Sequence, residues 1–317
     1  GSFFNGKIGV NLNYFYNRTT GIPVLLYSQY PSWFSTGWPN SSFIPYVNNN
    51  EDRRSGWDFV VNYNQKIGKV DFTLGVTGNI LSTEAIKRDE NYEDAYQSRI
   101  GKPLDGIWGL VSDGLYHCQE DIDRAPATSS FGEVKPGDIR YVDQNGDGVI
   151  DSKDEVYLGH AGWGGAPFSY GINITAKWKG WTLFLRGTGS TGTYGMKDSS
   201  YYWVYGDRKY SEEVVNRWTF ETARTATYPR LTTQSGTNNF RSSDFWLYKA
   251  NRFDLAKVQL TYDLPTRYLG HTWVRALKVY VSGDNLLTFS GERKLMEMNI
   301  GVTPQCRYFN LGAKIQF

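Results

Sequence analysis

Apolar and polar residues alternate with a period of two in eight separate stretches of this chain. The stretch 168–178 shows the pattern most clearly: every second residue from Phe168 to Trp178 is aromatic or aliphatic, and Ser, Gly, Asn, Thr and Lys stand between them. Strict alternation predicts β-strands that have one apolar face and one face of polar or small residues. The eight predicted strands are residues 8–16, 57–64, 70–80, 168–178, 181–187, 256–264, 277–283 and 309–317.

The connections between the predicted strands alternate in length. Long connections cover 17–56, 81–165, 188–253 and 284–308, and shorter ones cover 68–69, 179–180 and 265–275. In an up-and-down sheet this alternation places every long loop at one end and every short turn at the other. That layout is typical of outer-membrane barrels, which have tight periplasmic turns and extended extracellular loops. The sequence therefore predicts an all-β fold, an antiparallel transmembrane β-barrel with long extracellular loops.

A soluble β-sandwich or lipocalin-like barrel is the alternative fold, since its strands also alternate with a period of two. Such a fold would carry connections of about 40 to 85 residues outside a small core, which is uncommon in compact domains. In addition, Trp178 and Trp181 flank the short turn at 179–180, where the aromatic girdle of a membrane barrel is expected. These features favour the membrane barrel.

Composition narrows the range of functions. The 317 residues are 40% apolar and 16% aromatic, yet the mean hydropathy is −0.50, and no run reaches the roughly 18 to 20 apolar residues of a membrane-spanning helix. Helical patterns are scarce, and 211–220 is the best of them. The 34 Lys and Arg nearly balance the 32 Asp and Glu, so no nucleic-acid partner is expected. Cys118 and Cys306 are too few for a disulfide framework or a cysteine-based zinc site, and whether they pair stays open.

One acidic stretch has the spacing of a calcium loop. Residues 143–151 read Asp-Gln-Asn-Gly-Asp-Gly-Val-Ile-Asp, and Asp154 follows. Counted from Asp143, oxygen ligands stand at every ligand position of an EF-hand loop, and Gly148 stands where the sharp turn needs glycine. An oxygen-only set favours Ca²⁺ over transition metals. The predicted metal ligands are Asp143, Asn145, Asp147, Asp151 and Asp154 through their side chains and Val149 through its carbonyl.

The role expected for this ion is structural. No pair of flanking helices is predicted, so the loop lacks the parts of a sensor that opens when calcium binds. Extracellular modules of this kind bind Ca²⁺ with a Kd on the order of 10⁻⁴ to 10⁻³ M. The alternative is an acidic turn in which Asp and Asn side chains bond to the backbone without an ion. We predict an EF-hand-like calcium loop at 143–154 that orders the long extracellular loop at 83–165.

The acidic stretch belongs to an ordered set of motifs. Residues 136–151 read PGDIRYVDQNGDGVID, and with Asp154 and Leu158-Gly159 they resemble a segment of SusC/RagA-type TonB-dependent transporters. Further stretches resemble the family in the same order over nearly the whole chain. These are Gly56-Trp57-Asp58, Gly101-Lys102-Pro103, Asp113-Gly114-Leu115-Tyr116, LTYDLP at 260–265, NLLTF at 285–289 and the terminal Phe317.

The chain also departs from the pattern of the family. Where the strand that ends in L-x-Y-x-L-P usually begins with Tyr-Leu-Arg-Leu, residues 252–255 read Arg-Phe-Asp-Leu, so an acid replaces the base. Such transporters are much longer, with an N-terminal plug and a larger barrel before this region. The resemblance therefore implies that 1–317 is the C-terminal part of a larger barrel, and that TonB engages a region outside this chain.

The resemblance implies a transport function. The whole protein would import oligosaccharides or peptides across the cell outer membrane, driven by TonB, beneath a SusD-type surface lipoprotein that acts as a lid. This chain would supply lipid-facing barrel wall and extracellular loops. Aromatic clusters in the loops have faces that stack on sugar rings or hold peptides, and packing within the loops is their alternative role. The clusters are Tyr27, Tyr30, Trp33, Phe34 and Trp38, and Tyr201, Tyr202, Trp203 and Tyr205.

The sequence carries no pattern typical of an enzyme. The three histidines are scattered without a His-Glu-x-x-His motif, and neither a Gly-x-Ser-x-Gly elbow nor the context of a catalytic cysteine occurs. We therefore expect no catalytic residues. Two other functions stay open: a soluble calcium-dependent carbohydrate-binding β domain, and a self-contained outer-membrane barrel or adhesin.

Overall fold

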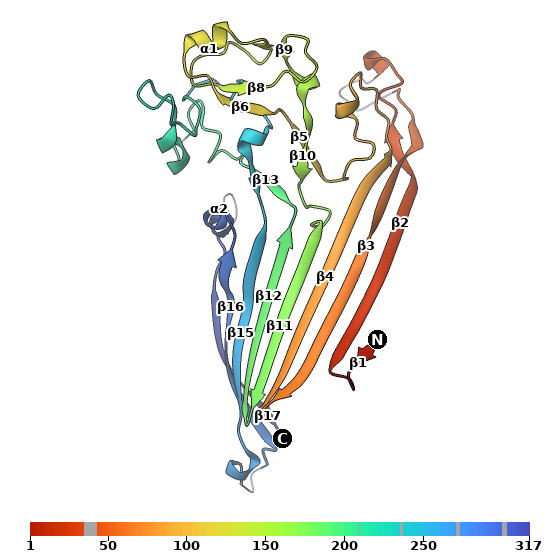
Figure 1. Ribbon diagram of the computed structural model, residues 1–317, viewed down its shortest axis with the longest axis vertical. Helices are drawn as coiled ribbons and strands as arrows, with labels where there is room; N and C mark the ends of the chain where they lie inside the picture. The colour runs from red at the N-terminus through yellow and green to blue at the C-terminus, as the bar shows by residue number, and fades with distance from the viewer. Residues whose placement is uncertain (35–42, 209, 235–236, 271–272, 300–302) are drawn as a thin grey trace.

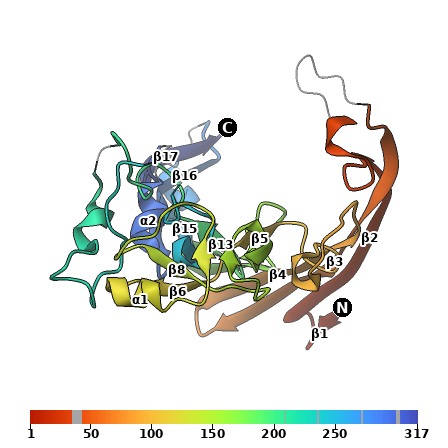
Figure 2. The ribbon, with the colours of Figure 1, turned by 90° about the horizontal axis from the view of Figure 1, so that it is seen from above.

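The computed structural model describes residues 1–34, 43–208, 210–234, 237–270, 273–299 and 303–317. Within these residues, nine strands form one antiparallel sheet in the order β1-β2-β3-β4-β11-β12-β15-β16-β17 (Figure 1). Seen from above, the sheet bends into an open arc (Figure 2). Its strands are β1 (Ser2–Phe3), β2 (Ile8–Leu25), β3 (Tyr46–Ile67), β4 (Val70–Lys87), β11 (Phe168–Trp178), β12 (Trp181–Thr191), β15 (Arg252–Asp263), β16 (Ala276–Phe289) and β17 (Tyr308–Gln316).

All eight strands predicted from the alternation are present, and several continue beyond the predicted ends. β3 runs over 22 residues and β4 over 18. Because β4 continues to Lys87, the long loop begins at residue 88 and not at 83 as expected. The two-residue β1 is an addition that the alternation did not predict; it pairs Ser2 with Gly9 and Phe3 with Ile8.

Loops and turns lie at opposite ends of the sheet, as predicted. Gly68 and Lys69 join β3 to β4, and Lys179 and Gly180 join β11 to β12. Gly68 and Lys179 adopt positive φ angles of 60° and 52°, as the tightest hairpin turns require. The connections after β2, β4, β12 and β16 leave the sheet at the other end (Figure 1).

The two faces of the sheet differ in chemistry. One face is marked by four residues that pair in turn across neighbouring strands: Tyr14, Trp57, Ile80 and Phe168. The residues one position away in register, such as Asp58 and its partners, form the polar face. Large apolar side chains on the first face are exposed, and they include Leu12, Tyr14, Trp57, Ile80, Trp178, Trp181, Leu183, Leu260, Val279, Val281 and Leu311.

Most of the buried apolar side chains lie in the loops rather than on the sheet. One cluster contains Leu110, Leu115, Ile139, Tyr141, Ile150, Tyr202, Val204, Val214, Trp218, Tyr228, Phe240 and Trp246. All of these residues come from 88–167 and 192–251, which we call the loop unit. Its two segments are joined directly where Leu110 N donates to Ser242 O at 2.9 Å and Asp244 N donates to Leu110 O at 3.1 Å. The loop unit is therefore one folded body above the strand ends (Figure 1).

Short elements build the loop unit. β5 pairs with β10, β6 with β8, β13 with β14, and β7 runs parallel to β9. The elements are β5 (Gly106–Gly109), β6 (Ser112–Leu115), α1 (Gln119–Asp123), β7 (Thr128–Ser129), β8 (Ile139–Tyr141), β9 (Val149–Ile150), β10 (Val156–His160), β13 (Tyr194–Met196) and β14 (Leu247–Lys249), with α2 (Arg293–Met298) in the last connection. Over the whole described chain, 3-10 turns occupy Ser32–Phe34, Ala95–Gln97, Ser152–Asp154, Glu212–Asn216, Asp244–Trp246 and Thr266–Tyr268.

Two sequence expectations are resolved by these elements. The helix expected at 211–220 is wrong: only Glu212–Asn216 turns, and it does so as a 3-10 helix. Cys118 and Cys306 are free and exposed. None of the helices in the described part of the chain has the length and apolar character needed to cross a membrane.

Candidate functional site

The first half of the predicted calcium loop, residues 143–148, forms a tight turn between β8 and β9, and its second half contains β9 and the 3-10 turn Ser152–Asp154. Gly146 and Gly148 adopt φ angles of 74° and 82°, a conformation that glycine takes without strain. Asp143 accepts hydrogen bonds from both glycine amides, at 2.7 Å from Gly146 N and 2.9 Å from Gly148 N. The backbone turn expected at Gly148 is therefore present.

The other side chains of the loop also bind its own backbone. Asn145 accepts from Asp147 N at 3.1 Å, and Asp147 accepts from Val149 N at 2.9 Å. Asp151 accepts from Lys153 N at 2.6 Å and caps the 3-10 turn Ser152–Asp154. These contacts have the pattern of Asx turns.

Asp154 is the buried member of the predicted ligand set. Its carboxylate accepts from Gln144 N and from Asp151 N, both at 2.8 Å, and the residue is fully buried. Burial raises the pKa of this carboxyl above its ordinary value, and the two backbone hydrogen bonds act in the opposite direction. Asp154 thus ties the beginning of the loop to its end.

The six predicted ligands are neighbours in sequence, but their side chains do not share a centre. Over the residues that the structure describes, no three or more His, Cys, Asp or Glu side chains are grouped as a metal site requires. To hold an ion, the side chains of Asp143, Asp147 and Asp151 would have to come together around one centre. The loop combines the ligand types and backbone turn of a calcium site with the side-chain positions of an Asx-turn loop.

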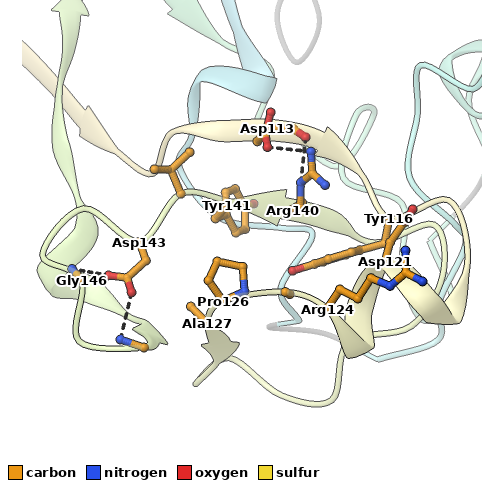
Figure 3. Close-up of a pocket in the computed structure, with 13 residues that line it drawn as sticks. Asp113, Tyr116, Asp121, Arg124, Pro126, Ala127, Arg140, Tyr141, Asp143 and Gly146 are labelled. Atoms are coloured by element: carbon orange, nitrogen blue, oxygen red, sulfur yellow. Dashed lines mark hydrogen bonds and ion pairs between the residues drawn. The ribbon is translucent and has the colours of Figure 1, made fainter.

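The same loop forms one wall of a pocket of about 560 Å³ (Figure 3). Tyr116 and Arg124 stand on the side opposite Asp143. Between them, Arg140 pairs with Asp113 through Nη2 and Oδ2 at 2.6 Å. The pocket therefore offers charges of both signs beside an aromatic ring.

A buried ion pair holds the two halves of the loop unit together. Asp138, from the PGD motif, pairs with Arg230 at 2.7 Å between Oδ1 and Nε. The same carboxylate accepts from Lys135 N at 2.8 Å and from Asn239 Nδ2 at 2.7 Å, and Asn239 Oδ1 accepts from Ile139 N at 2.8 Å. Sequence reasoning missed this network, because Arg230 and Asn239 carry no local signal that points to a residue about a hundred positions earlier.

The aromatic cluster of the third long connection is part of the core. Tyr202 is buried, and the rings of Trp203 and Tyr205 lie 6.0 Å and 5.1 Å from the ring of Phe240. Packing within the loops, the alternative role for this cluster, accounts for its position.

The aromatic cluster of the first long connection is more exposed. Tyr27 and Trp33 are both exposed, and Trp33 lies 6.3 Å from Phe34 between ring centroids. Phe34 in turn meets Phe43 edge to face. Trp38, which belongs to the predicted cluster, lies outside the described residues.

The departure at 252–255 produces an ion pair within one strand. Arg252 donates to Asp254 twice, from Nε at 2.7 Å and from Nη2 at 2.8 Å. Thr288 donates to the same carboxylate at 2.6 Å. Arg252 also lines a second pocket, of about 450 Å³, between the sheet and the loop unit. The signal for the pair was present in the sequence, since residues two apart in a strand share a face.

In comparisons with known proteins, no family model matches the chain. Two curated proteins of Formosa agariphila are similar in sequence. TonB-dependent receptor P26 is 27% identical over 319 residues, which cover 92% of this chain and 29% of the receptor. TonB-dependent receptor P3 is 24% identical over 236 residues, which cover 69% of this chain and 23% of the receptor.

Solved structures of the RagAB peptide transporter share the fold. One superposes with a TM-score of 0.68 at 17% identity, covering 92% of this chain and 31% of that chain. The RagAB peptide importer in the open-open state gives 0.67 at 16% identity, covering 92% and 30%. The chain thus spans less than a third of the length of each of these relatives.

The names of the relatives bear on activity and identity. The curated relatives are receptors and the structural relatives are transporters, in agreement with the expectation that this chain is not an enzyme. Together the comparisons confirm the resemblance that the ordered motifs indicate: the chain is similar in sequence to two TonB-dependent receptors and in fold to the RagAB peptide transporter.

Proposed function

We propose that this chain forms part of the barrel wall and the extracellular loops of a TonB-dependent transporter in the outer membrane. The observation that supports this most strongly is the location of apolar side chains. The sheet exposes them on one face, and the buried core lies in the loop unit instead. Such a face is stable where lipid covers it, and further strands beside the outer edges of β1 and β17 would close the barrel.

The height of the apolar face supports a membrane span. On β11, Phe168 and Trp178 lie on this face, ten positions apart. At about 3.3 Å per residue they are roughly 33 Å apart along the strand, and a tilt of about 40° reduces this to a height of about 25 Å. Outer-membrane barrels have an apolar band of about this height. Aromatic pairs stand at both levels: Tyr170 stacks on Phe168, and Trp181 lies 4.6 Å from Tyr262, as interfacial girdles do.

The transported material and the partners are part of the same proposal. The substrate is an oligosaccharide or a peptide, a SusD-type surface lipoprotein covers the loop unit, and TonB supplies energy through a region outside this chain. The structural relatives are titled peptide transporters, which supports the general class of substrate. A loop unit with its own core offers a lid protein a fixed surface.

The proposal includes a structural Ca²⁺ ion at 143–154. The ligand types at Asp143, Asn145, Asp147, Asp151 and Asp154 support it, as do the positive φ angles of the two glycines. Carboxylates drawn to a common centre repel one another unless a cation is present. Ca²⁺ would therefore stabilise the long loop in a second arrangement of its side chains, with the Val149 carbonyl as the sixth ligand.

The test uses the complete gene product in its native membrane. We expect it to require detergent for extraction and to migrate faster on gels before heating than after. We also expect uptake of a labelled oligosaccharide or peptide mixture that stops when TonB is deleted. A complete product that is soluble in water without detergent would support the carbohydrate-binding alternative. A heat-modifiable barrel that shows no TonB-dependent uptake would support the alternative of a self-contained outer-membrane barrel or adhesin.

A further inference from the structure

The pocket of about 450 Å³ beside Arg252 has a composition of its own. Two of the three methionines of the chain, Met196 on β13 and Met296 on α2, line it. Leu295 and Tyr202 add apolar surface to this side, Arg252 and Asp198 add charge, and the rest of the lining is mainly polar, with Ser190, Thr193, Ser199 and Asn299. We call this the methionine pocket.

The apolar wall of the methionine pocket is firmly placed. Met196 and Leu295 both pack against the core of the loop unit. β13 is held to β14, where Met196 pairs with Leu247. On the other side, Leu295 seats α2 against the same core, and the exposed side chain of Lys294 pairs with Glu212 at 3.0 Å. The apolar wall is therefore built from β13 and α2, which both pack against the core of the loop unit.

The methionines suit a ligand of varied shape. The thioether side chain is unbranched and polarizable, so it adapts to different apolar groups, and methionine-rich surfaces serve proteins that bind many related partners. Methionine donates no hydrogen bond, so the hydroxyl groups of a sugar ring buried against Met196, Leu295 and Met296 would lose their partners in water without replacement. This wall therefore favours an apolar side chain over a sugar.

The charged end of the pocket lies on the polar face of the sheet. Arg252 pairs across the strands with Ser190 and points to the face opposite that of Phe253. Its Nε and Nη2 bind Asp254, and the side chain remains one-third exposed. Nη1 takes no part in this pair, so it is placed to donate to a carbonyl or carboxylate oxygen. In a barrel, this polar face lines the interior.

We propose that the methionine pocket binds peptides, with an apolar side chain between Met196 and Met296 and a backbone or terminal carboxylate oxygen at Arg252. The inference rests on the proposed transport function, since the polar face of the sheet lies along a substrate path only if the sheet is transporter wall. It goes beyond that function by naming one substrate class and the residues that select it.

The experiment measures binding to the complete transporter, purified in detergent, by fluorescence polarization. Three dye-labelled probes are compared: Gly-Gly-Leu-Gly-Gly, pentaglycine and a linear glucose hexasaccharide. We expect the leucine peptide to bind most tightly. We expect Met196→Ala with Met296→Ala to weaken its binding about tenfold or more and to leave pentaglycine within about twofold. Arg252→Gln should weaken both peptides by a similar factor.

Matched variants separate the pocket from general effects on the fold. Met298→Ala removes the third methionine, which lies on α2 but outside the pocket, and should bind the leucine peptide as the wild type does. Met196→Leu with Met296→Leu keeps the apolar volume and should retain binding within about threefold. Heat-modifiable gel mobility checks that each barrel is folded.

Two results overturn the inference and leave the transport function standing. One is unchanged binding of the leucine peptide by the double alanine variant. The other is a wild type that binds only the hexasaccharide and imports it with TonB. If the wild type takes up none of the probes in a TonB-dependent manner, the proposed function is overturned and the inference falls with it.

Discussion

Asp138 and Arg230 form a buried ion pair that joins loop segments 92 positions apart in the sequence. Asp138 is 1% exposed, and its oxygens also bind Asn239 and the backbone of Lys135. Because β11 and β12 lie between the two segments, this pair is one of the contacts that make the loop unit a single body.

Asp138→Ala should destabilise the loop unit by about 1 to 3 kcal/mol, because it leaves the buried amide of Asn239 and the partly buried guanidinium of Arg230 without their acceptor. Trypsin cleavage in the loops at increasing urea concentrations measures the loss. Asp113→Ala is the control: it removes an ion pair with Arg140 whose side chains are 63% and 37% exposed, and such pairs contribute at most about 1 kcal/mol. Equal effects of the two variants would contradict this account of the loop unit.

Gly109 marks a close approach between the two loop segments. A methyl group added there would lie 2.4 Å from the carbonyl oxygen of Ser242. Gly109→Ala should therefore push the segments apart and cost about 1 to 3 kcal/mol, measured as a lower urea midpoint of loop proteolysis. Gly164→Ala serves as the control, since its added carbon meets no atom within 4 Å. A midpoint for Gly109→Ala that matches this control would sink the prediction.

Tyr228 makes the stability of the loop unit sensitive to alkali. Its hydroxyl donates to Tyr202 O at 2.6 Å and accepts from Val204 N at 3.2 Å, and burial raises its pKa to about 12. The folded state thus holds the phenol proton more tightly than the unfolded state, whose pKa is about 10. The stability from Tyr228 is complete below pH 10 and is lost as the pH rises toward 12.

Tyr228→Phe should lower stability near pH 7 by about 1 to 3 kcal/mol and make the loss above pH 10 less steep. Alkaline unfolding of both proteins, followed by tryptophan fluorescence, gives the difference. Parallel curves for the two proteins between pH 10 and 12 would show that Tyr228 does not carry this sensitivity.

Ile174 lies midway along the apolar face of β11, between the aromatic levels of Phe168 and Trp178. Ile174→Lys places a charge in the middle of the proposed lipid layer and should cost about 2 to 4 kcal/mol. Asn173→Lys, one residue away on the polar face, should be nearly neutral. Urea unfolding from lipid vesicles distinguishes them. If the asparagine variant is the more damaged, the assignment of the two faces is reversed.

Calcium should protect the loop at 143–154 from proteolysis. Millimolar Ca²⁺ is expected to slow cleavage there and EGTA to restore it, because the expected Kd lies on the order of 10⁻⁴ to 10⁻³ M. Asp147→Ala should abolish the protection and cost little without calcium, since Asp147 is exposed. Asp123→Ala, an exposed acid outside the loop, should keep it. If the wild type is cleaved at the same rate with and without Ca²⁺, the ion is no longer part of the proposal.

The sheet could be predicted because each strand needs only local information. In a run such as 168–178 the alternation is visible in the sequence itself. The two-residue turn that follows it indicates that the next strand is its antiparallel neighbour. The extension of β4 to Lys87 was missed because polar and charged residues interrupt the alternation there. One of them, Glu84, pairs with Arg53 on the neighbouring strand.

The loop unit could not be predicted in the same way. Its strands are two to five residues long, and each pairs with a segment farther along the chain, as β13 pairs with β14. Residues 211–220 have a helical pattern, but Val214 is drawn into the shared core and only a 3-10 turn remains. In the calcium loop, the backbone turn was predicted correctly from the position of Gly148. The bound ion stays a prediction.

The hairpin of β11 and β12 has a consequence for assembly. It pairs Phe168 with Thr191 at the loop end, so it sets the separation of the two segments that share the core. A slip of one residue in this hairpin would move every apolar side chain to the wrong face and would also shift one half of the core against the other. Closure of the core in the loop unit therefore favours the correct register of this hairpin over a slipped one.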